Sequence, residues 1–133
     1  MTMDSRPYFL SKPEGLEQTA VHQQQEAQFA LTYGDLLIGR LSLQNGRWSF
    51  QYSKAFKEQS KVAPLIGFSD VDRVYESAEL WPFFVSRIPG VSRPAVQTIL
   101  AEEGIDEHNL AALLARFGRK TIANPFVLEA IAA

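Results

Sequence analysis

The chain has no cysteine and only two histidines among its 133 residues. Without cysteine it can form neither disulfide bonds nor thiolate metal sites, and this composition fits a reducing compartment. The histidines, His22 and His108, lie far apart, and neither has a second histidine at the spacing of a metal-ligand pair. We therefore expect no metal site and no cofactor, and we interpret His108 as a surface residue in the first turn of a helix.

Long apolar runs and a strong charge imbalance are also missing. No apolar run approaches the roughly 20 residues of a membrane-spanning helix, and the first residues do not follow a signal-peptide pattern. The formal net charge of −2 argues against a chain that holds nucleic acid by electrostatic attraction. We expect a cytoplasmic protein without membrane or direct nucleic-acid contact. A hydrophobic content of 46% indicates one globular domain with its own core.

The motifs of common catalytic sites are absent as well. No glycine is part of a phosphate-binding loop that ends in Gly-Lys-Ser or Gly-Lys-Thr. One basic group, Arg116, Arg119 and Lys120, is compatible with contact to phosphate or to an acidic partner, but also with cations that cap a helix C-terminus. The sequence therefore predicts a protein that is not an enzyme and that works by binding.

The clearest positive signal is a β-hairpin around Asn45-Gly46. Both residues tolerate positive φ, and both flanking runs alternate between apolar and polar positions, as two paired half-buried strands do. A two-residue turn fixes the register, because a slip of one position would expose both aromatic residues of the second strand. The predicted pairs are Gln44 with Arg47, Leu43 with Trp48, Ser42 with Ser49, Leu41 with Phe50, Arg40 with Gln51, and Gly39 with Tyr52.

A third strand over residues 28–33 precedes this hairpin, with a tight turn at Gly34-Asp35. A regular pairing would place Leu31 opposite Ile38 and Phe29 opposite Arg40. The sheet would then have a second apolar face, covered either by the same chain or by a partner.

Helical periodicity dominates the second half of the chain. The first helix is expected to begin one or two residues after Ser77, with Pro82 in its first turn, and to reach Ile88. The second is expected from the N-cap Ser92 to about Glu103. The third follows an N-cap at Asp106 and carries an apolar stripe of Leu110, Leu113, Leu114 and Phe117.

Together these elements predict an α+β fold. A small antiparallel sheet, made of a three-strand meander and a short C-terminal strand at 126–128, packs against about three helices. Pro64, Leu65, Ile66 and Phe68 are expected to hold the connecting segment against the core. We assign the domain to residues 27–133 and interpret residues 1–26 as a flexible extension, or as an arm that folds on a partner.

The order and spacing of short motifs between residues 29 and 129 resemble the N-terminal subdomain 1 of HipA-type kinases. The motifs are Gly39-Arg40-Leu41, Gly46, Phe50, Tyr52, Pro64-Leu65, Phe83-Phe84, Ile88-Pro89, Leu113-Leu114 and Gly118-Arg119. The sequence departs from the family pattern at Gly90 and at Asn124-Pro125. No kinase body follows, so the chain looks like a stand-alone form, similar to the HipS subunit of split HipBST toxin–antitoxin systems.

This resemblance implies an antitoxin that binds a HipA/HipT-like serine/threonine kinase and holds it inactive. It also implies a possible third component, a helix-turn-helix DNA-binding protein, in a ternary complex. The alternative is an activating or structural subunit that completes the kinase or bridges it to the DNA-binding repressor.

A binding domain of this kind needs an anchor, and Trp81 is the candidate. It lies one position from the apolar helix stripe, which turns it about 100° away from the core face. Val85, four residues on, shares its side of the helix, and Pro82 lies beside it. The partner-binding residues are therefore predicted to be Trp81, Pro82 and Val85, although Trp81 could equally pack on the domain's own loop at residues 68–75.

Overall fold

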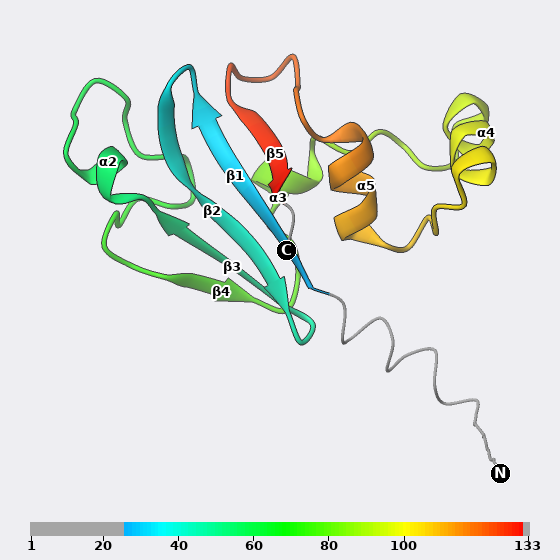
Figure 1. Ribbon diagram of the computed structural model, residues 1–133, viewed down its shortest axis with the longest axis horizontal. Coiled ribbons are helices and arrows are strands. Elements are labelled where there is room, and N and C mark those ends of the chain that lie inside the picture. The colour runs from blue at the N-terminus through cyan, green and yellow to red at the C-terminus, as the bar shows by residue number, and fades with distance from the viewer. Residues whose placement is uncertain (1–25, 132–133) are drawn as a thin grey trace, which may run out of the picture.

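The computed structural model describes residues 26–131, which hold a five-stranded antiparallel sheet and four short helices (Figure 1). The predicted α+β class is confirmed. The predicted extension lies outside the described residues except for Glu26. In chain order the elements are β1 (Ala27–Tyr33), β2 (Leu36–Gln44), β3 (Arg47–Tyr52), α2 (Lys54–Lys57), β4 (Tyr75–Ser77), α3 (Pro82–Val85), α4 (Pro94–Glu103), α5 (Leu110–Phe117) and β5 (Val127–Ile131).

The hairpin of β2 and β3 has the predicted register at all six pairs, from Gln44–Arg47 to Gly39–Tyr52. Its turn places Asn45 at φ 51° and Gly46 at φ 78°, the positive values that the Asn-Gly pair allows. Trp48 and Phe50 are buried on the core face. The sheet order is β4-β3-β2-β1-β5, so the chain adds β4, a strand that the sequence did not predict, beside β3.

The predicted pairing of β1 with β2 is wrong beyond the turn, because β2 contains a β-bulge. Leu31 lies opposite Gly39 and Phe29 opposite Leu41, which leaves Ile38 as the extra residue of β2. The bulge brings both β1 side chains to the core face, where Phe29, Leu31 and Ile38 are fully buried. The other face presents exposed residues, Gln28, Arg40 and Gln51. The expected second apolar face is therefore not formed.

Gly39 is required where β2 passes the ring of Phe50. A Cβ at this position would lie 2.5 Å from the backbone oxygen of Gln51 and 2.8 Å from the ring of Phe50. Gly39→Ala should therefore lower the free energy of unfolding by about 2 kcal/mol, measured by urea denaturation. Gly90→Ala is the matched control, because its Cβ would meet only the side chain of Arg93 at 3.5 Å. Equal stability of the two variants would contradict this steric argument.

Helix α3 is much shorter than the sequence predicts. Pro82 does lie in the first turn, at its first position, with Trp81 as the N-cap residue. The predicted extension to Ile88 is wrong, because after Val85 the backbone tightens into three-residue turns at Arg87 and Ile88. Pro89 follows directly, and the residue before a proline avoids the helical conformation.

The two N-caps predicted for the later helices are also wrong by one and three residues. Helix α4 starts at Pro94 with Arg93 as its N-cap, one position after Ser92, and ends at Gly104 (φ 67°) as expected.

Helix α5 is capped by Asn109, whose Oδ1 accepts a hydrogen bond from the backbone N–H of Ala112 at 3.1 Å. Asp106, the predicted cap, instead accepts the N–H of His108 at 2.8 Å in the preceding turn. His108 therefore lies before the helix rather than in its first turn.

The buried apolar side chains form two separate clusters, and the helices contribute to them differently. The larger one lies against the sheet and contains Phe50, Phe84 and Leu114. The smaller one joins α4 to α5 through Val96, Leu100 and Leu113. Adjacent residues of α5 thus face different clusters, and Figure 1 shows α4 set apart from the sheet with α5 between them. Helix α4 packs on α5 and not on the sheet, contrary to the expected arrangement.

The connection between β3 and β4 is held to the core by Tyr52. Its hydroxyl accepts the backbone N–H of Leu65 at 2.8 Å and donates to the carbonyl of Phe68, and burial raises the pKa of this hydroxyl. Leu65 and Phe68 are buried, as predicted. Pro64 and Ile66 were expected to help hold this segment, but both are exposed, and Ile66, between the two anchors, is 93% exposed.

Candidate functional site

The predicted partner-binding residues lie at the start of α3. The ring of Trp81 packs edge-on against Phe68, with centroids 5.2 Å apart, so the contact with the domain's own loop is present. The prediction that its position on the helix turns Trp81 away from the core face is wrong, because Trp81 is the extended residue before α3 and packs against the core. The tryptophan is nevertheless only partly buried, while Pro82 and Val85 are exposed. We call Trp81, Pro82 and Val85 the α3 surface. Behind it, Phe68 and Phe84 are fully buried, so this surface rests on a packed aromatic core.

Sequence reasoning missed Arg87, the only buried charged residue in the part of the chain that the structure describes. It lies just after α3 and is 4% exposed. Its guanidinium reaches the connection between α5 and β5, residues 118–126, which we call the clamped loop. Nη1 donates to the carbonyls of Gly118 (2.8 Å) and Arg119 (3.2 Å), and Nη2 donates to Asn124 Oδ1 (3.1 Å) and to the carbonyl of Phe126 (2.9 Å).

All four acceptors of Arg87 are uncharged oxygens. Burial lowers the pKa of the guanidinium, and its Nε atom is buried with no hydrogen-bond partner among the described residues. Desolvating an arginine is unfavourable, and here hydrogen bonds to neutral groups are what offsets it. The sequence did hold a hint, because this arginine stands between Phe84 and Ile88 on the predicted apolar stripe.

The clamped loop also carries its own hydrogen bonds. Asn124 Oδ1 accepts the N–H of Phe126 at 3.1 Å, and Thr121 Oγ1 accepts the N–H of Ala123 at 3.2 Å. The carbonyl of Arg119 accepts a second donor, the N–H of Leu128 in β5, at 2.9 Å. The loop is therefore held at both ends and at its turn, with Arg87 as its link to α3.

The three residues of the predicted basic group, Arg116, Arg119 and Lys120, lie in two different parts of the structure. Arg119 and Lys120 belong to the clamped loop, where Arg119 pairs with Glu129 of β5 at 3.1 Å and Lys120 is exposed. Arg116 instead joins α5 to α4 through its Nε, which lies 2.8 Å from Glu103 Oε1. Arg87 thus connects the α3 surface to two of the three predicted cations, and Arg116 is engaged elsewhere.

The pair between α4 and α5 makes a prediction about Glu103. The hydrogen bond from Arg116 and the attraction of its charge hold the pKa of this carboxyl below its ordinary value. Because the folded pKa is the lower one, the stabilisation is present above the unfolded pKa and is lost as pH falls through the folded pKa. Arg116→Gln should return the pKa of Glu103 toward its ordinary value, measured by NMR titration of the carboxyl carbon. An unchanged pKa in this variant would contradict the pairing.

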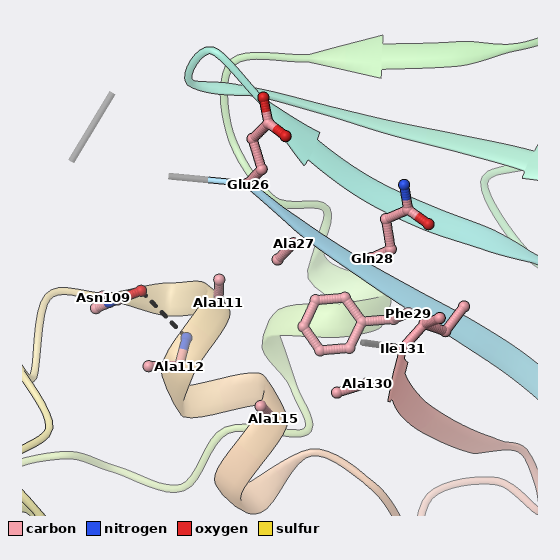
Figure 2. Close-up of a pocket in the computed structure, with 10 residues that line it drawn as sticks. All are labelled: Glu26, Ala27, Gln28, Phe29, Asn109, Ala111, Ala112, Ala115, Ala130 and Ile131. Carbon is pink, nitrogen blue, oxygen red and sulfur yellow. Dashed lines mark hydrogen bonds between the residues drawn. The ribbon is translucent and has the colours of Figure 1, made fainter. Parts of the chain in front are cut away.

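A second feature is a groove of about 310 Å³ between β1, β5 and α5 (Figure 2). In Figure 2 the ring of Phe29 points toward α5, whereas the side chains of Glu26 and Gln28 point away from that helix. The amide oxygen of Asn109 is engaged as the cap of α5. The groove therefore offers an apolar wall rather than a converging set of polar groups. Its lining consists of Glu26, Ala27, Gln28, Phe29, Asn109, Ala111, Ala112, Ala115, Ala130 and Ile131.

Within residues 26–131, no group of three or more acidic, histidine or cysteine side chains is placed to hold a metal ion. No helix in this part of the chain has the length and apolar character to cross a membrane. Three features of the described residues stand out: the α3 surface, the clamped loop with its exposed Lys120, and the apolar groove. The fold is that of a small α+β domain.

The HipA N-terminal domain family model matches residues 29–123, from β1 into the clamped loop, and the chain belongs to this family. The family suggested by the resemblance is thereby confirmed, and it relates the chain to HipA-type toxin–antitoxin components. The match ends directly before Asn124-Pro125, the turn at which the sequence departs from the family pattern. No curated protein matches the chain.

Proposed function

We propose that this chain is an antitoxin-type subunit that binds a HipA-like serine/threonine kinase and inhibits it. Membership of the HipA N-terminal domain family supports a HipA-like partner. The observation that carries the inhibitory contact is the α3 surface, where a partly exposed tryptophan and an exposed proline begin a short helix. Rigid aromatic residues of this kind are common anchors of protein interfaces.

The proposed mechanism is steric. The α3 surface docks at the active-site region of the kinase, with Trp81 in or against the cleft, so that the kinase cannot close around ATP or its substrate. The edge-on contact with Phe68 fixes one side of the tryptophan ring, which lowers the entropy lost when the ring docks. The chain itself contributes no reactive group to this mechanism. A cytoplasmic setting belongs to the proposal, since a chain without cysteine needs no oxidising compartment.

Co-expression with the kinase tests the direction of the effect. The kinase for this test is a HipA-family kinase that lacks its own N-terminal domain, sought among the genes that lie next to this one. Growth arrest caused by the kinase should be relieved when the chain is co-expressed, and kinase autophosphorylation should fall when purified chain is added. A deeper arrest would favour an activating subunit instead, and ATP turnover by the chain alone would favour an enzyme.

The separate groove favours one alternative, a subunit that bridges the kinase to a helix-turn-helix DNA-binding protein. Bridging needs two surfaces, and the groove between α5 and the β1–β5 edge involves none of the residues of the α3 surface. Direct nucleic-acid binding is not part of this alternative, because the chain is weakly acidic. A gel shift of operator DNA with kinase and repressor, with and without this chain, separates bridging from inhibition alone.

A further inference from the structure

The clamped loop presents Ile122 fully to solvent, with a relative exposure of 108%. A single exposed apolar residue is ordinary in itself. Here, however, the loop that carries it is fixed by four hydrogen bonds from a buried arginine and by bonds of its own. The domain therefore keeps an isoleucine in a defined exposed position through a buried cation that has only neutral acceptors.

The charge around Ile122 is of one sign. Residues 118–126 contain two cations, Arg119 and Lys120, and no acidic residue. Lys120 is exposed two positions before the isoleucine, whereas Arg119 shares its charge with Glu129 of β5. An apolar tip beside an exposed cation is complementary to an apolar pocket with an acidic rim. Ile66, 93% exposed in the other long loop, has no basic residue within three positions on either side.

We propose that Ile122 is the anchor of a second contact with the kinase, in which it fills an apolar pocket on the kinase surface while Lys120 faces carboxylates at the rim. This inference rests on the proposed function. Because Arg87 holds the loop in one conformation before binding, little further ordering is needed on association. The same arginine joins this contact to the α3 surface, so the two contacts form one rigid binding unit.

The test compares two isoleucines that are almost equally exposed. Binding of the purified full chain to the purified kinase is measured by interferometry for wild type, Ile122→Ser and Ile66→Ser. Ile122→Ser should weaken binding about tenfold or more, because burying an isoleucine at an interface contributes on this scale. Ile66→Ser should stay within about twofold of wild type. Since both side chains are exposed, thermal unfolding of both variants should match wild type.

The charge is tested separately. Lys120→Glu should slow association with the kinase, and added salt should no longer slow it further, because the substitution replaces an attraction to the acidic rim by a repulsion. If the rim of the pocket is not acidic, the association rate of this variant will equal that of wild type.

The remaining outcomes show whether this inference, the proposed function or both are wrong. If wild type binds the kinase and Ile122→Ser binds equally tightly, the proposed contact of Ile122 with the kinase is wrong, and the proposed function stands. If wild type does not bind the kinase at all, both fall. If Ile122→Ser changes only the binding of vesicles containing phosphatidylserine, or of RNA, and leaves kinase binding unchanged, the tip meets a different class of partner and the inference is overturned.

Discussion

Arg87→Met is expected to lower the free energy of unfolding by about 3 kcal/mol, because it removes four hydrogen bonds from a buried cation. The methionine keeps the apolar stem but leaves the carbonyls of Gly118 and Phe126 without this donor. For a domain of this size the expected decrease in melting temperature is about 10–20 °C. Urea and thermal denaturation measure the loss, and hydrogen exchange should show faster exchange within residues 118–126.

Two further variants test whether the loss of stability comes from the hydrogen bonds between Arg87 and the clamped loop. Arg116→Met removes an arginine whose ion pair with Glu103 is exposed, so its melting temperature should stay close to that of wild type. Arg87→Lys keeps the charge but not the planar fork of donors, so it should recover only part of the stability. Replacing a buried charge by an apolar side chain is sometimes stabilising. An Arg87→Met protein as stable as wild type would show that the guanidinium does not hold the loop.

Trp81→Ala is expected to weaken the binding of the kinase by about 2–4 kcal/mol, roughly 30- to 1000-fold in Kd. The reason is the loss of a large aromatic side chain that is partly exposed and fixed on one side by Phe68. Inhibition of kinase autophosphorylation, measured as a function of chain concentration, gives the loss in affinity. Trp81→Phe should retain part of the inhibition, because it keeps an aromatic ring at the anchor position.

Tyr75→Ala is the matched control for Trp81. Its ring packs edge-on against the same Phe68 at 5.0 Å, but from β4, outside the α3 surface. Both alanine variants therefore lose a ring contact with Phe68, worth about 1 kcal/mol of stability. Only the tryptophan variant should lose inhibition. If both weaken inhibition equally, the effect comes from the shared packing, and Trp81 is not the anchor.

Local chemistry explains why some elements could be predicted from the sequence. Asn45-Gly46 defines its own turn, so the β2–β3 register follows from the residues of a single hairpin. Pro82 at the start of α3 and Gly104 at the end of α4 are equally local, because each is set by the φ that its ring or missing side chain allows. The family resemblance depended on the same kind of short local motif.

Features that depend on distant parts of the chain were missed. The pairing of β1 with β2 depends on a bulge at Ile38, and no turn residue in the sequence marks this bulge. Because the bulge shifts the register, the predicted second apolar face does not form. The short strand β4 consists of three residues before α3 that pair with the otherwise free edge of β3, so it depends on a strand more than twenty residues earlier in the chain. Helix α4 was assigned to the sheet because periodicity identifies an apolar face but not the element that covers it.

For this protein the sequence by itself determined the α+β class, the family, the central hairpin and the candidate residues at the start of α3. Each of these depends on neighbouring residues or on the order of short motifs. Only the tertiary structure decided that Arg87 is buried and that it joins α3 to a loop more than thirty residues further on. The apolar stripe hinted that Arg87 is buried, but its acceptors in residues 118–126 could not be predicted, because a guanidinium donates to any oxygen that the fold brings near it and no local pattern marks such oxygens.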